Sequence, residues 1–269
     1  MLYDINLEKS NCGVGFITRK DGNQTHELLK LGHEALCKVP HRGGMASDGV
    51  GDGAGISIDL SLNFFEKLTK KKLKKGLFGV GNFFLPLDLK NKIAAEKFVD
   101  TVLLNFELKV VLKRDLPVNE NCLTKIQRAS QLPIKQWIFL SEIERTAKEF
   151  ASAIYNALLG IEKKAFSLTS LEGLYPLSMS SKMQVLKGRL NSNEIIPFFK
   201  DLLDPEHKVT ILYFHTRFST NTKPQPAMAQ PFHLIAHNGE LNTDKKNRIS
   251  ENAIAQTKKR SVVSPFGQS

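Results

Sequence analysis

The chain has 269 residues, of which 41% are hydrophobic, and a formal net charge of +11; this composition suffices for one large domain or two small ones and argues against disorder. No stretch reaches eighteen apolar residues and the first eleven residues contain no apolar run, so we expect neither a transmembrane helix nor a secretory signal, and no membrane partner. The three cysteines, Cys12, Cys37 and Cys122, are widely spaced. They predict a reducing, cytoplasmic location rather than a disulfide framework.

The positive charge raises the hypothesis of a nucleic-acid-binding protein. Its densest part is the lysine-rich segment 70–75, which we interpret as the solvated end of a helix, where cations favour the helix dipole. No aromatic residues interleave with these lysines to form a stacking platform. We therefore expect no nucleic-acid partner.

The hydrophobic pattern predicts strands and helices that alternate along the chain. In chain order we expect a strand at 13–18, a helix at 25–39, a glycine-dense loop at 41–55, a strand at 56–58, a helix at 63–75, a strand at 77–85, a helix at 89–108, a strand at 110–113, a helix at 122–131, a strand at 134–140, a helix at 143–159, strand-like segments broken by turns at 165–186, and strands at 209–215 and 232–237. No Gly/Ser/Pro-rich linker and no internal repeat interrupts this order, so the chain is expected to form one layered domain of mixed α and β structure.

The first motif is Cys12, which directly precedes Gly-Val-Gly and an apolar run at 13–17. This pattern predicts a thiol at the tip of a buried strand. If the eleven preceding residues were removed, Cys12 would carry a free α-amino group beside its thiol, and one residue would supply both a nucleophile and a proton acceptor. The alternative is a small buried hydrophobic residue at the start of a strand.

The second motif is a loop that contains His41-Arg42-Gly43-Gly44 and then glycine at every second position from 49 to 55. Glycine permits positive φ and close approach of the backbone to a neighbour or ligand. The spacing differs from Gly-x-Gly-x-x-Gly and the loop leads into a strand, so a dinucleotide site is not indicated. Arg42 could order a thiol or a carbonyl, and a tight loop without function is the alternative.

Two further motifs follow strands near the end of the chain. Arg217, at the end of the predicted strand 209–215 and among hydroxyl residues, suits bidentate capture of a carboxylate, or else a structural salt bridge. The pair Asn238-Gly239 is typical of a hairpin turn. A side-chain amide beside a glycine N–H also supplies two convergent donors, as in an oxyanion hole.

Taken in this order, the motifs closely resemble the N-terminal class II glutamine amidotransferase domain of the glutamate synthase large subunit. The resemblance runs from Cys12 to Asn242, and it rests on Cys-Gly-Val-Gly-Phe, His-Arg-Gly-Gly, Gly-Asp-Gly-Ala-Gly, His-x-Arg-Phe-Ser-Thr-Asn-Thr and His-Asn-Gly-Glu-x-Asn. The string 217–222 followed by Pro224 distinguishes the chain from other class II amidotransferases, which feed purine or amino-sugar synthesis and are the alternative enzyme.

The resemblance implies an α+β fold of the N-terminal-nucleophile hydrolase type, with four αββα layers in which two stacked antiparallel sheets lie between helix layers. Residues 1–11 would be a leader to be cleaved, and residues 12–269 the amidotransferase domain. By resemblance Cys12 is the nucleophile that hydrolyses L-glutamine to glutamate and ammonia through a thioester. Asn238 and Gly239 are the oxyanion donors, Arg217 binds the glutamine α-carboxylate, and Arg42 lies beside the nucleophile. No metal is implied.

The resemblance also implies a synthase domain or subunit as partner, where ammonia adds to 2-oxoglutarate to form glutamate. FMN and an iron–sulfur cluster are expected in a full-length synthase, and no cofactor is expected in this chain. The family binds the substrate's α-ammonium with an aspartate that would follow Ser269, so we expect a chain truncated at its C-terminal end. A folded but inactive remnant is therefore an alternative.

Overall fold

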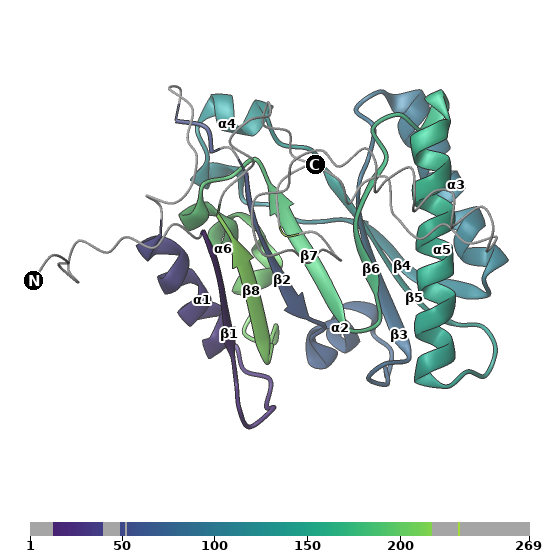
Figure 1. Ribbon diagram of the computed structural model, residues 1–269, viewed down its shortest axis with the longest axis horizontal. Coiled ribbons are helices and arrows are strands. Elements are labelled where there is room, and N and C mark those ends of the chain that lie inside the picture. Colours follow the sequence, from purple (N-terminus) through teal and green to yellow (C-terminus); the bar gives the residue numbers. More distant parts are fainter. Residues whose placement is uncertain (1–12, 40–48, 52, 217–230, 232–269) are drawn as a thin grey trace, which may run out of the picture.

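The computed structural model describes residues 13–39, 49–51, 53–216 and 231. Its described part is built on two four-stranded antiparallel sheets, with strand orders β1-β8-β2-β7 and β4-β5-β3-β6 (Figure 1). The strands are β1 (Val14–Thr18), β2 (Ala54–Asp59), β3 (Phe78–Phe84), β4 (Leu108–Asp115), β5 (Ile134–Ser141), β6 (Tyr175–Ser180), β7 (Met183–Gly188) and β8 (Ile211–His215). The prediction of an α+β fold with two antiparallel sheets is confirmed.

The helices pack on these sheets at both sides of the molecule. Figure 1 shows α3 and α5 beside the β4-β5-β3-β6 sheet, and α1 beside β1 and β8. The α-helices are α1 (Glu27–Lys38), α2 (Leu62–Thr69), α3 (Leu89–Asn105), α4 (Lys125–Ala129), α5 (Ala147–Ser167) and α6 (Ile195–Phe198), and the short 3₁₀ segments are η3 (Glu120–Cys122), η4 (Thr169–Leu171), η5 (Ser192–Glu194) and η6 (Lys200–Leu203).

Alternation along β3 separates two hydrophobic cores. Successive side chains of a strand point to opposite faces of the sheet. Phe83 therefore packs with Trp137 and with the buried residues of α3 and α5, whereas Phe84 faces the other sheet and packs in a core that includes Ile56 and Leu212. A third cluster fills the space between the same sheet and α2 around Phe65. One core thus lies between the two sheets and also includes buried residues of α1, whereas another joins α3 and α5 to the β4-β5-β3-β6 sheet.

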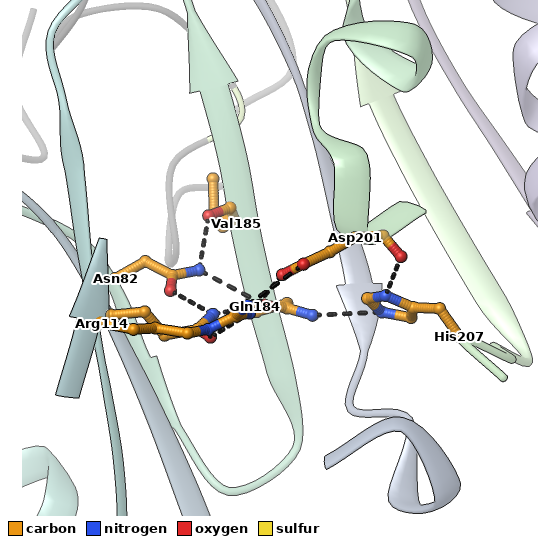
Figure 2. Close-up of polar contacts among 7 residues, drawn as sticks. Asn82, Arg114, Gln184, Val185, Asp201 and His207 are labelled. Carbon is orange, nitrogen blue, oxygen red and sulfur yellow. Dashed lines mark hydrogen bonds and ion pairs between the residues drawn. The ribbon is translucent and has the colours of Figure 1, made fainter. Parts of the chain in front are cut away.

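A polar network crosses the space between the two sheets (Figure 2). Arg114 of β4 pairs with the carboxylate of Asp201 and donates from Nε and Nη2 to Oε1 of Gln136, at 2.9 and 2.7 Å. Gln136 in turn donates to Oδ1 of Asn82 at 2.9 Å. Asn82 and Gln136 are fully buried, so these amides must find their partners within the protein.

The network continues to His207, which is buried and stacks on the ring of Phe64 with centroids 4.4 Å apart. Its Nδ1 lies 3.0 Å from the carbonyl oxygen of Asp201, which can only accept, so Nδ1 carries the proton. Nε2 is then free to accept from Nε2 of Gln184 of β7, 3.4 Å away. Burial lowers the pKa of His207 to about 4, which keeps the ring neutral near pH 7.

Most expected elements are present, but several bounds were wrong. Helix α2 ends at Thr69, not 75, because Lys70 adopts left-handed geometry with φ of 54°, so the lysine-rich segment follows the helix end. Helix α5 begins four residues later than expected, at a capping box between Thr146 and Glu149, and it continues to Ser167. The predicted helix 122–131 divides into η3 and the short α4, and α6 was not expected. The predicted strand 232–237 lies outside the described residues.

Candidate active site

The five residues expected to form the site lie outside the described part of the chain. They are Cys12, Arg42, Arg217, Asn238 and Gly239. The structure does describe the residue that follows Cys12 and the residue that precedes Arg217, together with the strand into which the glycine-dense loop leads. The positions of these neighbours therefore test whether the sequence motifs converge.

The segments that follow Cys12 and precede Arg217 are paired with each other. Val14, the first residue of β1, pairs with His215, the last residue of β8. One step further, the carbonyl oxygen of Gly13 accepts hydrogen bonds from the amide of Thr216 at 2.7 Å and from its Oγ1 at 3.2 Å. Thr216 is buried. The nucleophile candidate and the carboxylate-binding candidate are thus the next residues of two hydrogen-bonded segments.

The glycine-dense loop arrives at the same end of this sheet. Its last residues form the start of β2, where Gly55 pairs with His215 and Ala54 pairs with Gly188, at the end of β7. Described residues of three of the four motifs, namely Val14, Gly55 and His215, therefore lie side by side at one end of this sheet, although they are separated by up to about two hundred residues along the chain. Antiparallel pairing causes this, because it places the start of one strand beside the end of its neighbour.

Close packing explains part of the glycine pattern in the loop. Gly49 has a φ of 79°, which favours glycine. A Cβ at Gly51 would lie 2.3 Å from the carbonyl oxygen of Leu190, so only glycine fits there without a backbone shift. The carbonyl oxygen of Gly49 lies within hydrogen-bonding distance of Nε2 of Gln127 and Nδ2 of Asn191, at 3.4 and 3.3 Å. The end of the loop is therefore anchored to α4 and to the segment before η5.

Two polar residues that support the loop were missed by the sequence interpretation. Gln127 is buried, donates to Oε1 of Glu194 at 2.7 Å, and accepts from the amide of Thr124 at 2.7 Å. Thr124 and Gln127 form a capping box, and so do Asn191 and Glu194. The spacings Thr-x-x-Gln and Asn-x-x-Glu are the signal that could have indicated these two helix starts.

Lys187 is the other residue near the site that the sequence interpretation missed. It pairs with Gly55 on β2, so it shares a row of the sheet with His215 and Val14. Its side chain is fully buried, with Nζ 5.0 Å from the ring centroid of Tyr175. Burial lowers the pKa of Lys187 to about 7 and raises the pKa of the Tyr175 hydroxyl. A lysine directly after the apolar pair Val185-Leu186, in the strand 183–188, was the available signal.

The other two cysteines, Cys37 and Cys122, lie in the described part of the chain. Cys37 is exposed on α1, with Sγ 3.7 Å from Nε2 of His33. Cys122 is half-buried and donates to the carbonyl oxygen of Asn119 at 3.0 Å, and burial together with Glu194 raises its thiol pKa. A raised pKa disfavours the thiolate that nucleophilic chemistry requires.

In the described part of the chain, no group of three or more His, Cys, Asp and Glu side chains is placed to hold a metal ion. None of the helices among these residues is both long and apolar enough to cross a membrane.

Comparison with known proteins decides the family. Residues 12–266 match the family model described as glutamine amidotransferases class-II. The chain belongs to this family. The match, together with two antiparallel sheets and their helices, confirms the N-terminal-nucleophile hydrolase fold. The family is one of enzymes, and the match begins at Cys12.

Relatives of this amidotransferase domain include glutamate synthases. The chain is 32% identical over 258 residues to glutamate synthase (NADH) of Saccharomyces cerevisiae and 33% identical over 250 residues to the glutamate synthase (NADPH) large chain of Azospirillum brasilense. It is 31% identical over 252 residues to ferredoxin-dependent glutamate synthase 2 of Arabidopsis thaliana, a chloroplastic protein. These alignments cover 91 to 92% of the chain but only 12 to 16% of the relatives' own length.

Proposed function

We propose that this amidotransferase domain is the glutaminase part of a glutamate synthase, and that it hydrolyses L-glutamine with Cys12 as nucleophile after residues 1–11 are removed. The observation that carries the proposal is the pairing of Gly13 with Thr216. Consecutive Cα atoms are about 3.8 Å apart, so chain connectivity keeps Cys12 and Arg217 close to this pair. Nucleophile and carboxylate clamp would then lie at the same sheet edge. The start of the family match at Cys12 supports cleavage after Asn11.

The proposed mechanism uses one residue for two tasks. The α-amino group of Cys12, with an ordinary pKa near 8, accepts the thiol proton as the sulfur attacks the side-chain amide carbon of glutamine. Asn238 and the amide of Gly239 stabilise the oxyanion, an interaction whose loss commonly costs about a hundred- to a thousandfold in rate. The C–N bond breaks and ammonia leaves with the proton returned by the amine. Water then cleaves the γ-glutamyl thioester to release glutamate.

Two arginines would prepare the substrate for this step. Arg217 binds the α-carboxylate of glutamine through its planar guanidinium, which matches a carboxylate in bidentate geometry. Arg42 belongs to the same loop as Gly49 and Gly51. Gly49 accepts a hydrogen bond from Asn191, and Gly51 packs closely against the backbone of Leu190. We propose that Arg42 lies beside the nucleophile.

In a full synthase, the ammonia would pass to a synthase domain or subunit and add to 2-oxoglutarate. The relatives' greater length leaves room for such a domain, and FMN and an iron–sulfur cluster would belong to it. The similarity to glutamate synthases supports this function rather than that of an amidotransferase of purine or amino-sugar synthesis.

The test is glutamine hydrolysis by a chain that begins at Cys12, measured as glutamate released. We expect hydrolysis by this chain and its loss in Cys12→Ala, whereas the matched variant Cys37→Ala, which removes the exposed cysteine of α1, keeps it. Undiminished hydrolysis in Cys12→Ala would overturn the proposal, and absence of hydrolysis in every chain would favour an inactive remnant. Intact mass of the full chain after expression shows whether residues 1–11 are removed.

A further inference from the structure

The carbonyl oxygen of Gly13 receives more hydrogen bonds than an antiparallel ladder requires. The amide of Thr216, 2.7 Å away, supplies the bond that any residue except proline could make at this position. The hydroxyl of the same residue adds a second donor at 3.2 Å, which only serine or threonine supplies with so short a side chain. Thr216 is 2% exposed, so water does not readily replace this hydroxyl.

Two donors hold the Gly13 peptide more firmly than one. A carbonyl oxygen has two lone pairs, and when both are engaged the peptide plane has little freedom to rotate. The neighbouring contact acts in the same direction, because the ring of Phe214 lies over Gly15, where a Cβ would be only 2.3 Å from Cζ. Thr216 is the first residue after β8, two positions beyond Phe214. Together they hold the residues at 13 and 15.

The held carbonyl belongs to Gly13, which directly follows the proposed nucleophile. Thr216, which holds it, directly precedes the proposed carboxylate clamp. Catalytic groups must be positioned to within about half an ångström, and a displacement of about 1 Å can cost a hundredfold in rate. A hydroxyl at this point therefore acts on the distance between sulfur and substrate without touching either.

We propose, on the basis of the proposed glutaminase function, that Thr216 is a positioning residue whose hydroxyl fixes the Gly13 peptide and thereby sets Cys12 relative to Arg217. The hydroxyl acts through Gly13 and does not itself contact glutamine. Its contribution should therefore appear mainly in kcat, since a misplaced sulfur slows attack on a substrate that Arg217 still binds.

A control lies at the other end of the same pair of segments, where a threonine makes the same kind of hydrogen bond at an exposed rather than a buried position. Thr18, at the other end of β1, donates from Oγ1 to the carbonyl oxygen of Thr210 at 3.3 Å. Thr18→Val removes the same kind of hydrogen bond between the same segments, but far from the site. Thr216→Val keeps the shape of the side chain without its hydroxyl, and Thr216→Ser keeps the hydroxyl. Thr216→Ala compared with Thr216→Ser gives the same contrast if the valine variant does not fold.

Each variant is made in the chain that begins at Cys12, and kcat and KM for glutamine are measured. Thr216→Val should lower kcat about three- to tenfold, the effect expected from loss of one neutral hydrogen bond, with a smaller change in KM. Thr216→Ser should restore most of kcat, and Thr18→Val should leave it unchanged. The rate at which iodoacetamide alkylates Cys12, followed by mass across a pH series, should also change in Thr216→Val, and this measurement needs no turnover.

Equal kcat and equal alkylation profiles in Thr216→Val and the parent would overturn the proposal, as would an equal fall of kcat in Thr18→Val, which would show that the bond only stabilises the sheet. These outcomes are separate from failure of the glutaminase function. If Cys12→Ala hydrolyses glutamine as well as the parent, the function itself is wrong, and the alkylation profile still decides whether Thr216 positions residue 12.

Discussion

The ring of Phe214 occupies the space that a side chain at position 15 would need, with Cζ 2.3 Å from the position of a Cβ on Gly15. Packing across the β1–β8 pair therefore requires the second glycine of the Cys-Gly-Val-Gly motif. This glycine lies on β1, two residues beyond Gly13. The apolar ring in turn contributes to the core between the two sheets. The motif thus contains the proposed nucleophile at position 12 and a glycine at position 15 that packing requires.

This contact predicts that Gly15→Ala is destabilising. We expect the free energy of unfolding to fall by about 1 to 3 kcal/mol, as in other overpacked sites, measured by urea denaturation. Phe214→Leu should reduce the cost of Gly15→Ala in a double-mutant cycle, because the two positions share one contact. The control is Gly160→Ala in α5, where a Cβ meets nothing within 4 Å and where we expect a gain of about 0.5 to 1 kcal/mol. A neutral Gly15→Ala would contradict this account of the motif.

Arg217→Met should raise KM for glutamine more than it lowers kcat. If the proposed clamp is correct, the variant loses charge-assisted hydrogen bonds to the α-carboxylate, and we expect KM to rise about ten- to a hundredfold. The substrate provides the control, since the α-methyl ester of glutamine lacks that carboxylate. The preference of the parent for glutamine over the ester, as kcat/KM, should largely disappear in the variant. An unchanged preference would place the carboxylate elsewhere.

The burial of His207 should make the protein less stable at acidic pH. Burial lowers its pKa to about 4, whereas an unfolded chain has a histidine pKa of about 6.5. Its contribution is therefore fully present above about pH 6.5 and is lost as the pH falls towards 4, with a slope of up to about 1.4 kcal/mol per pH unit. The measurement is the free energy of unfolding of the parent minus that of His207→Gln. The difference should shrink over this interval, and a constant difference would refute the prediction.

The burial of Lys187 should make stability depend on pH in the alkaline range. Burial lowers its pKa from 10.5 to about 7, so between these values the unfolded state binds the proton that the folded state releases. The stability contributed by the neutral amine is fully present above about pH 10.5 and is lost as the pH falls to 7. Relative to Lys187→Met, the parent should therefore gain up to about 1.4 kcal/mol per pH unit from pH 7 to 10. Urea denaturation across this range tests it, and parallel pH profiles of parent and variant would rule it out.

Local pattern was enough to predict many of the elements. The apolar runs around β3 and β5, each bounded by proline or by polar turn residues, place these two strands to within a residue or two. The order of the motifs from Cys12 to Asn242 was enough to predict the family, which the match over residues 12–266 confirms. Helix ends were less predictable, because Lys70 ends α2 by adopting a left-handed conformation that composition does not reveal.

Only the tertiary structure shows that segments from distant motifs lie side by side. Local sequence contains no information that Gly13 lies against Thr216, since the two are 203 residues apart and only the antiparallel pairing of β1 with β8 joins them. The burial of Lys187 and the bond from His207 to Gln184 likewise depend on which sheet face each strand presents to its neighbour. The sequence by itself determined the chemistry available at Cys12 and Arg217. The long-range pairing of β1 with β8 determined that their neighbours Gly13 and Thr216 are in contact. The pattern of side chains along a strand specifies its two faces but not its partner strand.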